Sequence, residues 1–110
     1  MLEAGVDVLI YAGDADFVCN WMGNQAWTEA LEWSGKKLYN EADTNYFEME
    51  DGTVGGEGKS AKVSEGANDE STGRLTFLKI YDAGHLSPKD QPYATLQMLN
   101  RFIENGDIGT

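Results

Sequence analysis

The chain has 110 residues, so it corresponds to one domain or less, and a content of 41% hydrophobic and 11% aromatic residues excludes a disordered tail. Lys and Arg number 8 against 19 Asp and Glu, and the net charge of −11 argues against nucleic acid and against a membrane surface as partners. No apolar run approaches the roughly 18 residues of a transmembrane helix. Cys19 is the only cysteine, so no disulfide can form within the chain.

The first predicted element is a strand over residues 6–12, where a short and nearly continuous apolar run is typical of a central strand buried on both faces. Gly13 ends this strand. A helix is predicted over residues 20–34, with Gly35 as its C-terminal stop. The expected apolar face of this helix consists of Trp27, Ala30 and Leu31.

Residues 36–74 are predicted to form a variable insert of antiparallel strands with exposed turns, because the segment alternates weakly and is rich in glycine. Short strands are expected at 36–40 and 44–50. A hairpin is expected over 51–63, followed by a polar loop over 66–73.

A second clear strand is predicted over residues 75–81 and a final helix over 91–105, with Pro92 in its first turn and Gly106 after its end. The expected apolar stripe of this helix consists of Leu96, Leu99, Phe102 and Ile103. The order strand, helix, antiparallel insert, strand, helix predicts an α/β fold. Two long strands do not make such a sheet alone, so we expect the sheet to be incomplete without further polypeptide.

Titratable residues follow both apolar strands. Asp14 and Asp16 follow the first strand, and His85, the only histidine, follows the second. Functional groups of open α/β sheets gather beyond the carboxyl ends of the strands, and an imidazole is the usual general base for an alcohol nucleophile. Taken singly, the aspartates are equally typical of turn caps, and the histidine is equally typical of a structural residue.

Together, the acid and the histidine match two thirds of a hydrolytic triad, because α/β-hydrolases carry the triad in the order Ser, Asp or Glu, His. None of the chain's serines lies in a G-x-S-x-G turn. We therefore expect the nucleophile to come from polypeptide outside this chain.

Two strings, YAGDADFVCNWMGNQAWTEAL and YDAGHLSPKDQP, together with MLNRFI, resemble the C-terminal part of serine carboxypeptidases, in particular the carboxypeptidase Y type. The resemblance covers roughly residues 2–34 and 75–104 and is specific at both ends. It implies that residues 1–110 are the C-terminal segment of a catalytic domain with an α/β-hydrolase fold.

The resemblance also implies roles for individual residues. Asp16, the second aspartate of the GDxD string, would be the catalytic acid, and His85 would be the catalytic base. Cys19 would line the substrate pocket as a free thiol, and Leu86 would line the pocket for the departing C-terminal residue. The sequence departs from the family pattern at Ala83, where many members have glycine, and at Ser87, where carboxypeptidase Y has valine; Leu86 itself replaces a methionine.

The implied activity is release of C-terminal amino acids from peptides or proteins, with no metal and no cofactor. The serine would belong to a missing N-terminal portion or to a separate chain. The family resemblance alone implies a vacuolar, lysosome-like or secreted setting. The chain by itself is expected to be inactive.

Two alternatives remain open from the residues. Asp14 and Asp16 could hold Mg²⁺ in a phosphoryl-transfer site, which would need further acids at a neighbouring strand end. The chain could also be a non-catalytic truncated fragment.

Overall fold

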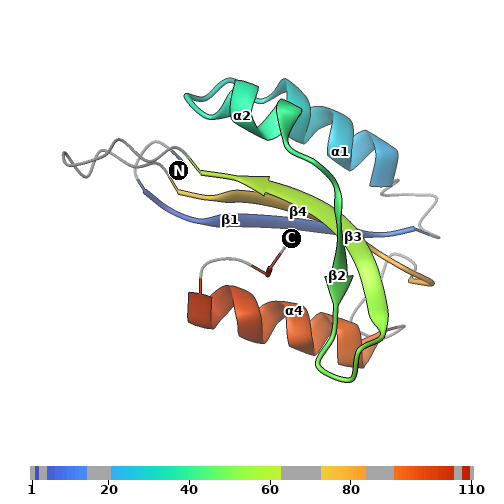
Figure 1. Ribbon diagram of the computed structural model, residues 1–110. Helices are drawn as coiled ribbons and strands as arrows, with labels where there is room; N and C mark the ends of the chain where they lie inside the picture. The colour runs from blue at the N-terminus through green and yellow to red at the C-terminus, as the bar shows by residue number, and fades with distance from the viewer. Residues whose placement is uncertain are drawn as a thin grey trace.

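The computed structural model describes most of the chain: residues 2, 5–14, 21–62, 73–83, 91–105 and 108–109. These residues form a mixed four-stranded sheet with helices on both faces (Figure 1). The strands, in the spatial order β1-β4-β3-β2, are β1 Val8–Gly13, β4 Leu75–Ile80, β3 Val54–Ala61 and β2 Asn45–Glu48. The helices are α1 Trp21–Ala30, α2 Lys36–Glu41 and α4 Pro92–Asn105. Within these described ranges, no helix is long and apolar enough to cross a membrane.

The pairing of β1 with β4 determines where the candidate site lies. The two strands are parallel and in register from Val8 opposite Leu75 to Gly13 opposite Ile80. Strand β3 pairs antiparallel with the other side of β4, and β2 pairs antiparallel with β3. The carboxyl ends of β1 and β4 therefore lie next to each other at the same end of the two strands.

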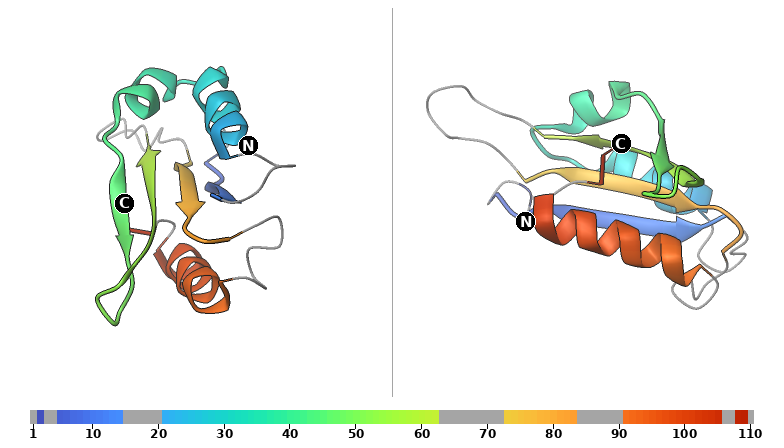
Figure 2. Two further views of the ribbon diagram at one scale, coloured as in Figure 1. Left: turned by 90° about the vertical axis from the view of Figure 1, so that its right-hand side faces the viewer. Right: turned by 60° about the horizontal axis from the view of Figure 1, so that its bottom comes forward.

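Strand β4 is the centre of the molecule and is buried on both faces, because helices cover the sheet from both sides (Figure 2). Its side chains alternate between two hydrophobic clusters, as the two-residue period of a strand requires. Leu75 and Phe77 pack in the cluster on the side of α1 and α2. Leu78 and Ile80 pack with α4.

The central position predicted for the strand over residues 6–12 stays a prediction about the complete sheet. Among the described strands, β1 has a neighbour only on its β4 side, and three of its six residues are half-buried. The strand itself and its end at Gly13 are confirmed. An apolar run signals burial, but it does not say whether the burying partner belongs to the same chain.

The region around Gly35 also differs from the prediction. Helix α1 ends at Ala30, and residues 36–40, expected as a strand, belong to helix α2. The carbonyl of Gly35 accepts a hydrogen bond from the Tyr39 N–H at 2.9 Å, so Gly35 precedes a helix instead of ending one. Tyr39 is the buried residue of α2, and its hydroxyl lies 2.8 Å from Thr28 Oγ1 of α1, so this helix packs beside α1.

In both long helices, most residues of the predicted apolar stripe are not the ones buried against the described sheet. In α1 the buried residue is Thr28, whereas Trp27 is 45% exposed. In α4 the buried residues are Ala94, Thr95 and Met98, and Phe102 is half-buried against the same cluster. Leu96, Leu99 and Ile103 are exposed in the described structure.

The predicted insert is part of the main sheet. Strand β2 confirms the strand expected over 44–50, whereas most of the hairpin expected over 51–63 is the single strand β3, which pairs with β2 on one side and with β4 on the other. In the turn between β2 and β3, Gly52 has φ +86°, and the Asp51 carboxylate accepts hydrogen bonds from the N–H and hydroxyl of Thr53. These bonds lower the Asp51 pKa, because they stabilise its ionised form. Apart from Gly73, the predicted loop over 66–73 lies outside the described residues.

The burial of Tyr39 predicts that the free energy of unfolding depends on pH. Its side chain is fully buried, and its hydroxyl lies 2.8 Å from Thr28 Oγ1. Burial raises the pKa of Tyr39 to about 12; the Glu29 carboxylate also raises it, and the Thr28 hydrogen bond opposes the rise. Because the pKa in the folded state exceeds the unfolded value of about 10, the stabilisation is complete below pH 10 and is lost as pH rises towards 12.

The test is urea unfolding of the parent chain and of Tyr39→Phe across this range. We expect the variant to lose about 1 kcal/mol at neutral pH, for the missing hydrogen bond, and to show a flatter decline above pH 10. Lysines also titrate there, so only the difference between the two proteins is informative. Identical slopes would contradict the assignment to Tyr39.

Candidate active site

The four predicted site residues, Asp16, Cys19, His85 and Leu86, lie outside the described residues. They fall in two segments, 15–20 and 84–90. The structure does describe the residues at both ends of each segment, and these residues define the frame from which the site is built.

The two segments start side by side. Gly13 and Ile80 are partners in the parallel pair, and the Asp14 N–H donates to the Ile80 carbonyl at 2.9 Å. The Asp82 N–H in turn donates to Asp14 Oδ1 at 2.8 Å. The residues that follow β1 and β4 therefore lie side by side, and hydrogen bonds join the two strand ends.

The far ends of the segments are also joined to this region. Trp21, where α1 begins, has its ring 4.1 Å from Lys79 Nζ on β4. Gln91, just before α4, donates from Nε2 to the Asp82 carbonyl at 3.3 Å. The Gln91 carbonyl accepts bonds from the Thr95 N–H at 3.0 Å and from its hydroxyl at 2.7 Å, which anchors the first turn of α4. All four ends thus contact β4 or the residues that follow it.

The backbone after β4 bends sharply. Asp82 has φ +54°, in the left-handed region that aspartate tolerates better than most residues. Ala83 is fully buried among residues of the α4 cluster. A small side chain at 83 fits this packing, which gives a physical reason for alanine or glycine at this position.

Asp14 has a structural role in this arrangement. Its side chain accepts the backbone N–H of Asp82 and so joins the turns after the two strands. This is the capping role that aspartate commonly plays in turns. Asp14 therefore connects the carboxyl ends of β1 and β4 through its side chain.

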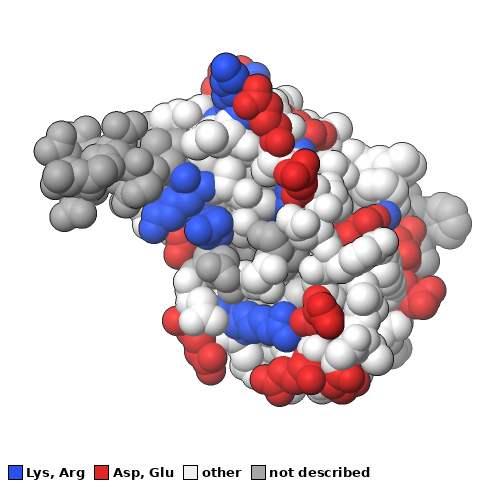
Figure 3. Space-filling view, viewed as in Figure 1, with Lys and Arg blue, Asp and Glu red and all other residues white. Residues whose placement is uncertain are grey.

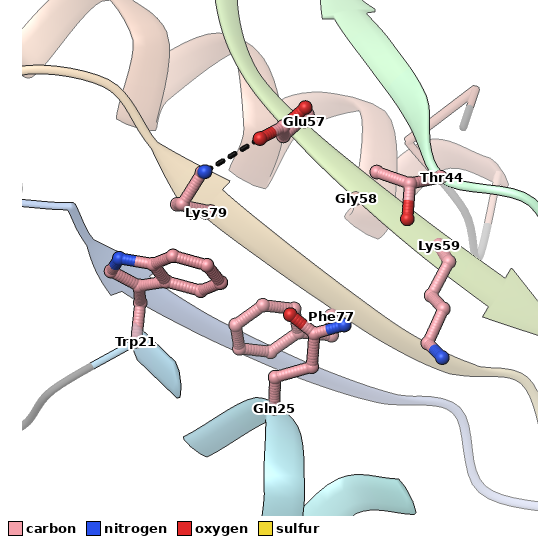
Figure 4. A pocket seen from close by; sticks show the side chains of 8 residues that line it. All are labelled: Trp21, Gln25, Thr44, Glu57, Gly58, Lys59, Phe77 and Lys79. Carbon is pink, nitrogen blue, oxygen red and sulfur yellow. Dashed lines mark ion pairs between the residues drawn. The ribbon is translucent and has the colours of Figure 1, made fainter. Parts of the chain in front are cut away.

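Charged side chains lie close to the frame on the α1 face of the sheet. Lys79 Nζ is 2.5 Å from Glu57 Oε1, beside a cavity of about 280 Å³ that Trp21 and Phe77 also line (Figure 4). The pKa of Tyr81 is raised, first by burial and then by the Glu57 carboxylate. On the face shown in Figure 3, basic side chains are interspersed with acidic ones. In the described part of the chain, no three His, Cys, Asp or Glu side chains group to hold a metal ion.

Comparison with known proteins identifies the family. The model of the serine carboxypeptidase family matches residues 1–105, and the chain belongs to this family. The chain is 53% identical over 102 residues to the carboxypeptidase Y homolog A of Leptosphaeria maculans. The aligned region covers 93% of this chain and 17% of that protein. The corresponding protein of Pyrenophora tritici-repentis is 50% identical over 101 residues, covering 92% and 17%.

The chain therefore spans about a sixth of the length of these relatives. The membership confirms the resemblance seen in the GDxD and AGH strings. It favours serine hydrolase chemistry over the phosphoryl-transfer alternative built on Asp14 and Asp16. A mixed sheet with helices on both faces is compatible with part of a serine carboxypeptidase domain.

Several residues of the frame were not singled out in the sequence. Lys79 is the clearest case: it is a lone charge in the apolar strand LTFLKI, and such a charge signals a specific partner. Glu57 and Gln91 carry no comparable signal, because isolated polar residues in a predicted insert or before a helix are ordinary. Their roles depend on which strands become neighbours.

Proposed function

We propose that residues 1–110 supply the catalytic acid and base of a serine carboxypeptidase, Asp16 and His85. The observation that carries the proposal is the parallel register of β1 and β4, in which the segments bearing the two residues leave adjacent strand ends. Membership of the serine carboxypeptidase family supports the same roles. The finer assignment to an α/β-hydrolase fold belongs to this proposal.

The proposed reaction is acyl transfer. A serine from another stretch of polypeptide would attack the scissile carbonyl, and His85 would take its proton and return it to the leaving amino acid. Asp16 would accept a hydrogen bond from the other ring nitrogen of His85, which holds the required tautomer and stabilises the imidazolium. The backbone N–H groups that stabilise the oxyanion would come from outside this chain.

The described surface supports the need for further polypeptide. The outer edge of β1 is unpaired among the described strands, and an apolar groove lies beside it, lined by Val8, Ile10, Trp27 and Leu31 among others. On α4, Leu96 and Ile103 are 56% and 78% exposed. Uncovered apolar surface of this kind marks a region that another segment covers.

Substrates in this proposal are the C-termini of peptides or proteins. Cys19 and Leu86 would line the pocket, with Leu86 next to the departing residue. The proposed setting is a vacuole, a lysosome-like compartment or the secretory pathway. These assignments rest on the family.

The test compares the isolated chain with a chimera. In the chimera, residues 1–110 replace the matching segment of the Leptosphaeria maculans relative. We expect the isolated chain to release no C-terminal amino acids, because it lacks the serine. The chimera should hydrolyse peptides from the C-terminus and be labelled by a serine-directed fluorophosphonate. Hydrolysis by residues 1–110 alone, or a folded chimera that is not labelled, would contradict the proposal.

A further inference from the structure

Lys79 connects three elements at the frame of the site. It lies on β4 directly opposite Glu57 of β3 in the antiparallel register. Its Nζ is 2.5 Å from Glu57 Oε1 and 4.1 Å from the centre of the Trp21 ring at the start of α1 (Figure 4). The Tyr81 ring lies 5.9 Å from the same nitrogen. One ammonium group thus contacts the residue after segment 15–20 and approaches the aromatic residue that follows β4.

Partial burial makes these contacts stronger than those of a surface ion pair. The Lys79 side chain is 16% exposed and that of Glu57 30% exposed. Exposed ion pairs contribute little, whereas a cation over an indole gains strength as water is removed. Loss of the ammonium would leave the Glu57 carboxylate partly buried without its partner, which carries its own cost.

The Trp21 ring is only partly held by apolar packing. It packs against the hydrophobic cluster on the α1 side of the sheet, but it also borders the cavity of about 280 Å³. Atoms that face a void lose their dispersion contacts on that side. The contact with Lys79 therefore acts together with this packing in fixing where the ring, and with it the first turn of α1, lies relative to β4.

We propose that Lys79 is a positioning residue for the reaction, acting through Trp21 on the segment that carries Asp16. This inference rests on the proposed function. Segment 15–20 is held at its start by the Asp14 bonds to β4 and at its end by Trp21. Removal of the Lys79 contact releases one of these two ends. The Asp16 carboxylate then meets the His85 imidazole less often in the productive geometry.

The chain contains a matched control for this arrangement. Lys59 of β3 has its Nζ 2.7 Å from Glu29 Oε2 and 4.6 Å from the centre of the Tyr39 ring. The chemistry is the same, a lysine paired with a glutamate over an aromatic ring. This second cluster joins β3 to the later part of α1 and to α2, whereas the Lys79 cluster joins β4 to the first residue of α1, although both lysines line the same cavity. We expect its loss to lower stability while the contact between Lys79 and Trp21 is retained.

The experiment measures kcat and KM of the chimera for release of a C-terminal amino acid, in the parent and in variants. For Lys79→Met we expect kcat to fall on the order of 10-fold to 100-fold with KM little changed, because small misplacements of reacting groups act on the transition state. Lys79→Arg should recover most of the rate, since a guanidinium can still pair with Glu57 and stack over Trp21. Lys59→Met should lower the urea midpoint and leave kcat unchanged.

The outcomes separate this inference from the proposed function. An active His85→Ala chimera would contradict the proposed function itself. An inactive His85→Ala chimera together with equal kcat values for Lys79→Met and Lys59→Met would overturn only the role of Lys79. Should Lys79→Met not fold, Trp21→Leu removes the same contact while the ion pair of Lys79 with Glu57 is retained, and a kcat equal to the parent's would overturn the inference.

Discussion

We expect replacement of His85 by alanine to abolish peptide hydrolysis by the chimera, because no other residue of this chain has an imidazole that could act as the general base. Asp16→Asn should lower kcat on the order of 10⁴-fold, because an amide stabilises the wrong tautomer of the histidine and does not balance the charge of the imidazolium. Substrate binding should persist in both variants. The measurement is steady-state hydrolysis of a peptide, with KM and circular dichroism recorded in parallel.

Asp14→Asn is the control for this pair. Asp14 uses one oxygen to accept the Asp82 N–H at 2.8 Å, and the carbonyl oxygen of asparagine accepts the same bond. We therefore expect a loss of less than about tenfold for Asp14→Asn, in contrast to the triad variant. If Asp14→Asn caused the large loss of kcat and Asp16→Asn the small one, the assignment of Asp16 as the catalytic acid would be wrong.

Gly58→Ala should cause the largest loss of stability among the substitutions considered. A Cβ at this position would meet the backbone carbonyl of Phe77 and the Cα of Leu78, in the middle of the β3–β4 pair. Backbone atoms of a central strand cannot move aside as a flexible side chain can. Overpacking of this kind costs on the order of 3 kcal/mol. The measurement is the free energy of unfolding in urea.

Gly23→Ala is the matched control for the glycine substitution. Gly23 lies on the exposed side of α1, and a Cβ there would meet no atom within 4 Å. Alanine loses less conformational entropy in a helix, so this change should stabilise the chain by about 0.5–1 kcal/mol. Equal effects of the two substitutions would show that the close approach of β3 to β4 does not limit the residue at 58.

The sequence is informative where local pattern and burial coincide. Strands β1 and β4 and helix α4 are predicted within one or two residues, because each combines a sustained apolar pattern with a glycine or proline at its end. The two strings after the strands also identify the family, since they are long and specific.

The sequence is uninformative where a segment has few apolar residues. Residues 36–40 contain Leu38 and Tyr39 side by side, which fits neither a helical nor a strand period, and only the burial of Tyr39 against Thr28 selects the helix. Likewise, α4 has two candidate apolar faces. Packing against the sheet selects the face with Ala94 and Met98 over the larger side chains.

By itself, the sequence determined the family, strands β1 and β4, the final helix and the candidate acid and base, Asp16 and His85, because those properties reside in contiguous residues. Only the tertiary structure decided that β1 pairs with β4, that Asp14 joins the two strand ends and that Lys79 pairs with Glu57 beside Trp21. Each of these depends on which distant segments become neighbours. Pairing between strands far apart in the chain is a property of the whole fold, and no local pattern encodes it.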